Sequence, residues 1–270
     1  MITGGSRGLG LALADAVLAA GHRAVVTARD PSRLAHLVAR YGDAIRVAAL
    51  DVTDTVAATQ AVQAAVDAFG GLDVLVNNAG YGDVGSVEDT TLDDIRRQIE
   101  TNLFGTIIMT KAAVPVMRAQ RSGHIIQLSS VGGRIGAPGR AAYSAAKWGV
   151  EGFSESLALE MALIGVHVTV VEPGGFRTDF AGASTSLKEG RPEYDDVVGA
   201  TIRKQRAYDG HQPGDPARAA QAILHLAGAA SPPLRIALGT DAVAAIEHAD
   251  RGRLEERTAW RWLSTSTDYA

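Results

Sequence analysis

Short runs of apolar, β-branched residues alternate with longer alanine-rich segments along most of this chain. Apolar residues at consecutive positions are typical of strands that are buried on both faces of a parallel sheet. The short runs predict strands at 23–28, 45–50, 72–76, 124–128, 166–171 and 234–238. The longer segments predict helices at 8–20, 31–40, 55–69, 92–120, 142–163, 215–226 and 241–263.

The regular alternation of one strand with one helix indicates an α/β fold. It predicts a doubly wound (Rossmann-like) parallel sheet with helices on both faces. No fixed-period repeat or Gly/Ser/Pro linker divides the sequence, so we expect one domain over residues 1–270. The segment at about 174–214 departs from the rhythm, with weak periodicity after a strand. An irregular insertion at the carboxyl end of a strand predicts a substrate loop, because such sheets bind ligands at that edge.

The beginning of the chain is short for this fold. Only residues 1–3 precede the first glycine loop, where a strand of about five residues is usual. A first strand of this kind lies in the middle of the sheet, so we expect its neighbours to lose hydrogen-bond partners. The sequence therefore predicts that the natural chain starts upstream, with an apolar run that completes the strand.

Composition and charge narrow the function classes. The chain has 26 Lys and Arg against 30 Asp and Glu, a net charge of −4 without a basic cluster, which argues against nucleic-acid binding. No apolar stretch is long enough for a transmembrane helix, and no signal-peptide pattern is present, so a cytoplasmic location without membrane association is expected. Cysteine is absent and the seven histidines are scattered, which predicts no catalytic metal.

A glycine-rich loop precedes the first predicted helix. Gly4, Gly8 and Gly10 have the spacing G-x-x-x-G-x-G. Glycines let the backbone approach a pyrophosphate, and a helix N-terminus offers free N–H donors and a partial positive charge. A plain tight turn would also accommodate such glycines, so the loop alone does not decide between the two.

Four further motifs follow the loop in order. They are 77–80 (NNAG) after a strand, Asn102 in a helix, Ser130 followed by Tyr143 and Lys147, and 173–175 (PGG) leading to Thr178. With these motifs, residues 3 to about 180 resemble the short-chain dehydrogenase/reductase family. The resemblance implies an NADP(H)-dependent oxidoreductase, an alcohol dehydrogenase or carbonyl reductase. Such an enzyme transfers a hydride between nicotinamide and a carbonyl or secondary alcohol.

The family's catalytic tetrad maps onto Asn102, Ser130, Tyr143 and Lys147. Tyr143 and Lys147 are four residues apart and share one face of a predicted helix, although this pair also arises by chance in amphipathic helices. The resemblance implies that Tyr143 transfers a proton and that Ser130 orients the substrate oxygen. Lys147 would favour the phenolate and hold the nicotinamide ribose, and Asn102 would carry a water that links Lys147 to solvent.

Two of these assignments have open alternatives. Ser129 competes with Ser130, and the family's thirteen-residue spacing to the tyrosine selects Ser130. Neighbouring residues of an extended segment face opposite ways, so one of the two serines points at the substrate. Asn102 could also be a simple polar kink in its helix.

The residues after the second strand favour NADP over NAD. An NAD enzyme places a carboxylate at the strand end to bind the ribose 2′-hydroxyl, whereas this chain has Ala28 followed by Arg29. Asp30 precedes Pro31, which fits a helix N-cap. Arg29 and Arg7 would suit a 2′-phosphate; alternatively, both are solvated surface residues. The expected cofactor-binding residues are Gly4, Ser6, Arg7, Gly8, Leu9, Gly10, Arg29, Asp51, Val52, Asn78, Ala79, Gly80, Tyr143, Lys147, Pro173, Gly174 and Thr178.

The expected substrate pocket mixes small, apolar and aromatic residues without a cluster of Lys or Arg, which predicts a small neutral ketone or alcohol. The expected assembly is a homodimer or homotetramer. Trp260 and Trp262 are expected to pack in the core, with a subunit contact as the alternative. A non-catalytic NADP-binding regulator on the same fold is an alternative. The presence of both Tyr143 and Lys147 argues against it. A truncated, unstable product that cannot bind cofactor is a second alternative.

Overall fold

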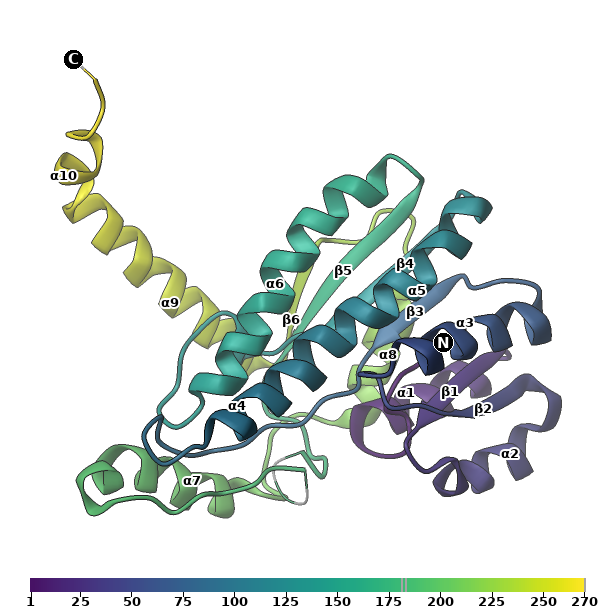
Figure 1. Ribbon diagram of the computed structural model, residues 1–270, viewed down its shortest axis with the longest axis horizontal. Helices are drawn as coiled ribbons and strands as arrows, with labels where there is room; N and C mark the ends of the chain where they lie inside the picture. Colours follow the sequence, from purple (N-terminus) through teal and green to yellow (C-terminus); the bar gives the residue numbers. More distant parts are fainter. Residues whose placement is uncertain (181, 183, 270) are drawn as a thin grey trace.

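Parallel strands lie at the centre of the molecule, and helices cover them on both sides (Figure 1). The computed structural model describes residues 1–180, 182 and 184–269. Residues 181 and 183, in the expected substrate loop, and residue 270, at the end of the expected domain, lie outside the described residues. The architecture is the doubly wound, Rossmann-like α/β fold that the sequence predicts.

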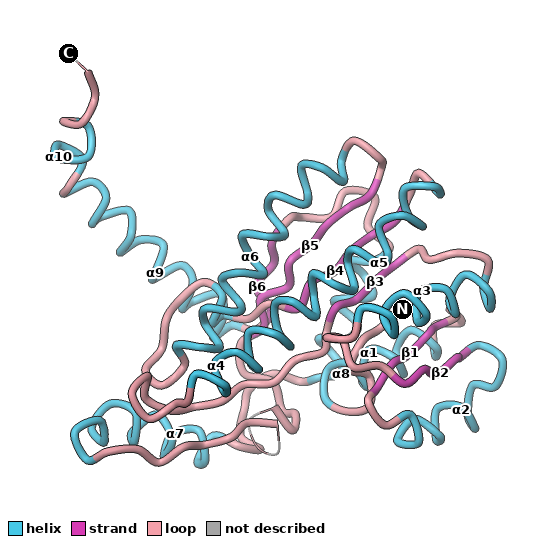
Figure 2. Tube along the Cα trace, viewed as in Figure 1, coloured by secondary structure: helices cyan, strands magenta, loops and turns pink. Residues whose placement is uncertain are grey.

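The strands fall close to the predicted positions. They are β1 (Ala24–Ala28), β2 (Ile45–Ala49), β3 (Val74–Asn77), β4 (Gly123–Leu128), β5 (Val166–Pro173) and β6 (Arg235–Leu238). Strand β1 pairs with β2, and β3, β4, β5 and β6 pair in that order, every pair being parallel. Figure 2 shows the strands running side by side through the molecule.

The first three residues join these two groups of strands. Ile2 forms parallel bridges to Val26 of β1 and to Val76 of β3. The Ile2 N–H donates to the Val25 carbonyl oxygen at 2.9 Å, and the Thr3 N–H donates to the Val76 oxygen at 3.0 Å. Residues 1–3 therefore lie between β1 and β3 and pair with both. This is the position at which the sequence analysis expected the neighbouring strands to lose hydrogen-bond partners.

The helices connect successive strands. They are α1 (Gly8–Ala19), α2 (Ala35–Tyr41), α3 (Thr55–Phe69), α4 (Leu92–Ile99), α5 (Gly105–Gln120), α6 (Ala141–Ala162), α7 (Ala200–Tyr208), α8 (Pro216–Ala227), α9 (Thr240–Ala259) and α10 (Arg261–Thr265). Side-chain caps fix the N-termini of some of these helices. The Asp54 carboxylate accepts hydrogen bonds from backbone N–H groups in the first turn of α3, and the Asp215 carboxylate does the same for α8.

Two apolar layers hold the helices against the sheet. In one layer, apolar side chains of α3, α5 and α6 pack against Val25, Leu75 and Ile125. In the other layer, side chains of α1, α2 and α8 pack against the next residue of each strand, such as Val26 and Ile126. Successive strand residues point to opposite faces, so consecutive apolar residues serve both layers. This pattern explains why the strands are apolar at consecutive positions.

The structure corrects three expectations about helices. The helix predicted at 92–120 is interrupted by a π-helical turn at Glu100–Phe104, because Asn102 bonds to a neighbouring loop, as described below. The segment 174–214 is not wholly irregular, since it contains α7. The predicted C-terminal helix is divided into α9 and α10, which extend away from the sheet (Figure 1).

Trp260 and Trp262 are not core residues. Their side chains stack on each other and are 55% and 66% exposed, because α9 and α10 leave the body of the protein before residue 260. None of the helices in the described part of the chain combines the length and hydropathy needed to cross a membrane.

Candidate active site

A cavity of about 910 Å³ opens at the carboxyl ends of the strands. Its size lies within the range of ~300–1,000 Å³ that is typical of small-molecule sites. The glycine loop and the ends of β1 to β5 form one part of the lining, and α6, α7 and the loop after β5 form the other. All the predicted site residues line this cavity except Gly10 and Asn102.

The glycine loop gives the cavity a donor-rich wall. Gly4 and Gly8 have φ values of +64° and +58°, which side chains rarely adopt. At Gly10 a Cβ atom would lie 2.6 Å from the Gly4 carbonyl oxygen. No side chain caps the N-terminus of α1, where Gly8 and Leu9 line the cavity. The free N–H groups and the helix dipole fit the pyrophosphate of a dinucleotide.

Two arginines lie beside this wall. Arg7 and Arg29 line the cavity together with Ala28, and neither forms an ion pair with the residues that the structure describes. The Asp30 carboxylate instead accepts from the Ser32 N–H at 3.1 Å and caps the short helical turn at Pro31–Leu34. The prediction that Asp30 is an N-cap is confirmed. Arg7 and Arg29 are therefore the cations that could hold a charged group of the nucleotide at this end of the cavity.

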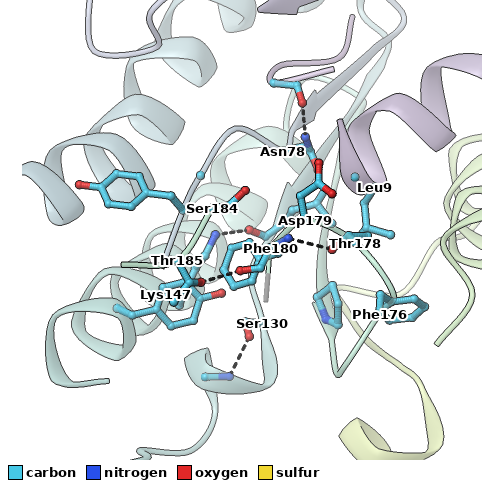
Figure 3. A pocket seen from close by; sticks show the side chains of 18 of the residues that line it. Leu9, Asn78, Ser130, Lys147, Phe176, Thr178, Asp179, Phe180, Ser184 and Thr185 are labelled. Carbon is cyan, nitrogen blue, oxygen red and sulfur yellow. Dashed lines mark hydrogen bonds between the residues drawn. The ribbon is translucent and has the colours of Figure 1, made fainter. Parts of the chain in front are cut away.

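Ser130, Tyr143 and Lys147 all line another part of the cavity, and Figure 3 shows Ser130 and Lys147 there. The Ser130 hydroxyl oxygen accepts from the Gly132 N–H at 3.1 Å, which fixes the short turn after β4. Tyr143 is 7% exposed, and the Lys147 Nζ lies 5.9 Å from the centre of its ring. Lys147 also donates to the Leu128 carbonyl oxygen at 2.6 Å. The three side chains from β4 and α6 therefore lie together, as their spacing predicts.

Burial dominates the protonation of this group. It raises the pKa of the Tyr143 phenol, while hydrogen bonding with Ser130 and the charge of Arg140 act in the opposite direction. Burial also lowers the pKa of Lys147 to about 8, against the attraction of the Glu151 carboxylate. Desolvation thus disfavours the charged forms of both groups. That Lys147 and the positive nicotinamide ring together favour the phenolate stays a prediction.

Asn102 is fully buried within the π-helical turn. Its Nδ2 donates to the Tyr81 carbonyl oxygen at 2.7 Å, and its Oδ1 accepts from the Tyr81 N–H at 3.0 Å. Both atoms of the amide therefore hold the loop after β3, which carries Asn78, Ala79 and Gly80 into the cavity lining. The water link from Asn102 to Lys147 stays a prediction.

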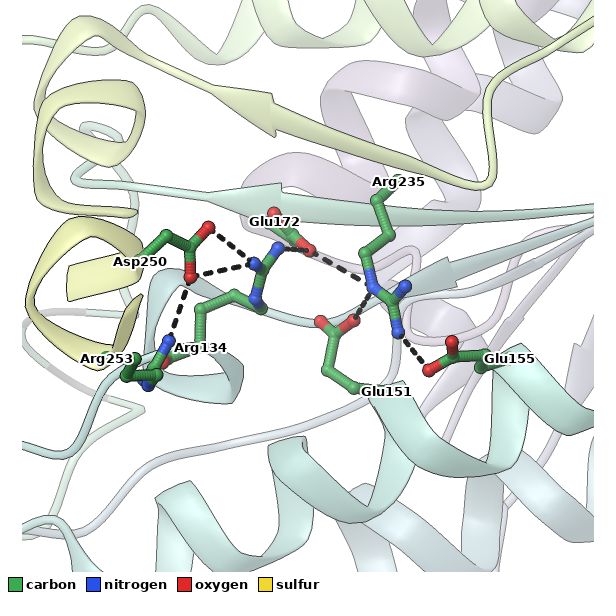
Figure 4. A network of polar contacts seen from close by, with 7 residues as sticks. All are labelled: Arg134, Glu151, Glu155, Glu172, Arg235, Asp250 and Arg253. Carbon is green, nitrogen blue, oxygen red and sulfur yellow. Dashed lines mark hydrogen bonds and ion pairs between the residues drawn. The ribbon is translucent and has the colours of Figure 1, made fainter. Parts of the chain in front are cut away.

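A network of ion pairs supports the wall that carries Ser130 (Figure 4). The Glu172 carboxylate is 2% exposed and pairs with Arg134 at 3.0 Å and with Arg235 at 3.8 Å. Arg134 also pairs with Asp250 of α9 at 2.9 Å. The network thus ties the turn after Ser130 to β5 and α9. Its members are Arg134, Glu151, Glu155, Glu172, Arg235, Asp250 and Arg253.

The sequence analysis placed the segment 177–210 near the substrate but missed the helical face that this segment turns to the cavity. Helix α7 contributes Thr201, Lys204, Gln205 and Tyr208 to the cavity. Their spacing of three or four residues is that of one helix face, a signal that was present in the sequence. Arg140, one turn before Tyr143, was also missed; its Nη2 donates to the Gln205 Oε1 at 2.9 Å.

Comparison with known proteins agrees with this geometry. Residues 1–189 match the family model described as short chain dehydrogenase. The chain belongs to this family. A short-chain dehydrogenase structure from Streptomyces avermitilis is 40% identical, with a TM-score of 0.92, and the match covers 99% of this chain and 98% of that one.

Two curated relatives are similar to this chain over most of their length. The oxidoreductase BOA17 of Botryotinia fuckeliana is 45% identical, over 98% of this chain and 97% of that protein. A 3-ketodihydrosphingosine reductase of Bacteroides thetaiotaomicron is 35% identical, over 88% of this chain and 87% of that protein. Solved structures of the same fold, 23% and 26% identical, hold NAD and NADP⁺, respectively. This chain is therefore an oxidoreductase of the short-chain dehydrogenase family.

Proposed function

We propose that this short-chain dehydrogenase uses NADP(H) to interconvert a carbonyl compound and a secondary alcohol. The observation that carries the proposal is the convergence of Ser130, Tyr143 and Lys147 on one wall of the cavity that the glycine loop completes. The name of the Bacteroides relative, a ketone reductase, supports the direction of carbonyl reduction.

The side chains supply the proton chemistry of such a reaction. NADPH, when bound, supplies the hydride. Tyr143 donates its phenolic proton to the substrate oxygen and recovers a proton afterwards, and Ser130 donates a hydrogen bond that orients the same oxygen. Because its pKa is about 8, Lys147 is largely protonated at neutral pH. Its ammonium can then stabilise the phenolate and hold the ribose hydroxyls.

To test this function, the loss of NADPH absorbance is measured with a panel of aldehydes and ketones. We expect turnover of some members that requires enzyme and carbonyl together. The proposal is contradicted if calorimetry shows that NADPH binds and no member of the panel is turned over. That result would favour the alternative of a non-catalytic NADP-binding regulator.

The proposed preference for NADPH gives a sharper prediction. Replacing Arg29 by alanine should lower kcat/KM for NADPH and leave that for NADH nearly unchanged, because only NADPH carries the 2′-phosphate. A hydrogen bond to a charged group is worth ~1.5–3 kcal/mol, so a loss of roughly 10- to 150-fold is expected. Steady-state kinetics with both cofactors measures it.

A matched control is Arg33→Ala. Arg33 lies on the turn after Arg29 and pairs with Asp30 at 3.7 Å, so its loss should not change cofactor preference. Equal kcat/KM for NADPH and NADH in the wild type would contradict the assignment of Arg29 to the 2′-phosphate.

A further inference from the structure

We propose that the substrate carries a carboxylate and that Arg140 binds it, with Lys204 of α7 adding a second positive charge. The inference rests on the proposed carbonyl–alcohol chemistry, because it places the carboxylate beside the Tyr143 hydroxyl where the carbonyl reacts. The sequence predicted a neutral substrate because the expected lining showed no cluster of Lys or Arg. That lining included Lys204, within the substrate loop, but not Arg140.

Arg140 is placed to face the substrate. It lines the cavity and is half-buried, and its guanidinium carbon lies 5.8 Å from the centre of the Tyr143 ring. A Cβ atom added at Gly82 would lie 3.0 Å from its Nη1, so the loop after β3 closes over one side of the guanidinium. The only side-chain bond that the described residues give it is the one to Gln205, which leaves most of its five N–H donors available.

The charge of Arg140 is not neutralised by the protein. No carboxylate of the described residues lies within ion-pair distance, 4.0 Å, of its guanidinium. Burial lowers the pKa of Arg140, against smaller opposing effects of Tyr143 and Asp83. Arg140 is also the N-cap residue of α6, where the helix dipole disfavours a cation. A half-buried cation at such a position gains most from an anionic ligand.

Helix α7 brings a second cation to the lining of the cavity. Lys204 and Gln205 lie on the α7 face that lines the cavity, and Lys204 forms no ion pair with the described chain. The bond from Arg140 to the Gln205 oxygen ties α7 to α6 at this point. A bound carboxylate would therefore contact two helices, one of which also carries Tyr143.

A carboxylate fits this site better than a phosphate. The rings of Tyr143 and Phe180 lie 5.8 Å apart at their centres and narrow the space beside Arg140. Asp83 and Asp179 also line the cavity, and their charges repel a dianion more strongly than a monoanion. The planar guanidinium matches the two oxygens of a carboxylate. The substrate class is thus an oxo acid, or the corresponding hydroxy acid.

Paired substrates test the subsite. We expect the wild type to have a higher kcat/KM for acetoacetate than for methyl acetoacetate, or for levulinate than for methyl levulinate. Replacing Arg140 by glutamine should raise KM for the preferred acid by roughly 10- to 100-fold and leave KM for the ester nearly unchanged. Because the Arg140 charge also acts on the Tyr143 pKa, any change in kcat should be the same for both substrates. Arg140→Lys should restore part of the loss in KM. The control is Arg206→Gln on α7. Arg206 is exposed and pairs with Glu189 at 2.8 Å, so its replacement should leave kcat/KM for the acid and for the ester unchanged.

A second measurement does not depend on turnover. In calorimetry with the protein and NADP⁺, pentanoate should bind more tightly than pentanamide, and Arg140→Gln should remove the difference. Failure of both acids and esters to react would overturn the proposed function, and this titration would then decide the subsite alone. The subsite itself is overturned if the wild type prefers the ester. It is also overturned if Arg140→Gln lowers kcat/KM equally for the acid and the ester and shifts the pH profile of both. That result would mean that Arg140 acts only through the protonation of Tyr143.

Discussion

Replacing Tyr143 by phenylalanine is expected to lower kcat by ~10²–10⁴-fold while the Kd for NADPH stays nearly unchanged. The substitution removes only the hydroxyl, and the ring keeps its contacts with Phe180 and Lys147. Among the side chains that converge on the substrate oxygen, the Tyr143 phenol is the proton donor in the proposed reaction. Steady-state kinetics and calorimetric titration with NADPH separate the two effects.

A second tyrosine provides the matched control. The Tyr41 hydroxyl donates to the Asp15 carboxylate at 2.7 Å, away from the cavity lining. Tyr41→Phe therefore removes a phenol and a hydrogen bond without a catalytic consequence, and its kcat should equal that of the wild type. If Tyr143→Phe kept more than half of the wild-type kcat, Tyr143 would not be the proton donor.

Local pattern was sufficient for the strands, and the family resemblance was needed to choose Ser130, Tyr143 and Lys147 among the polar residues. Strand positions are visible in the sequence because consecutive apolar residues serve two core layers at once. Ser130 and Tyr143 could be placed together because the end of a parallel strand and the following helix meet at the same edge of the sheet. These are short-range relations, and the chain fixes them within one strand–helix unit.

The parts that sequence reasoning missed depend on contacts between distant segments. The bond between Arg140 and Gln205 joins residues 65 positions apart, and no local pattern indicates it. The π-helical turn at Asn102 exists because the side chain holds the backbone of Tyr81. In the same way, the pKa directions of Tyr143 and Lys147 follow from burial in the folded protein, which spacing along one helix does not reveal.

The second large effect is expected at Lys147, where catalysis and stability have opposite requirements. Replacing Lys147 by methionine should strongly lower kcat and raise KM for NADPH, because one ammonium serves both the Tyr143 phenolate and the ribose. The same substitution removes a buried charge whose pKa is lowered from 10.5 to about 8. We expect the stability of the two proteins to depend differently on pH.

The direction follows from proton binding. Between pH 8 and 10.5 the unfolded wild type binds the Lys147 proton and the folded protein has released it, so wild-type stability rises with pH in that window. The rise amounts to about 3 kcal/mol in total, and Lys147→Met lacks it. The stability of the variant relative to wild type is therefore highest below pH 8 and falls as the pH increases. The lost bond to the Leu128 oxygen shifts this difference by a constant without changing its slope.

Denaturant unfolding of both proteins from pH 7 to pH 10 measures the slope directly. The control is Lys111→Met, since Lys111 is exposed on α5, and its stability difference from wild type should not vary with pH. A flat difference for Lys147→Met would show that the lysine is not desolvated in the folded protein. An unchanged KM for NADPH would separately remove Lys147 from the cofactor site. If both effects are observed, the lysine that catalysis requires is also one that weakens the fold at neutral pH, as expected when a charged group is buried for function.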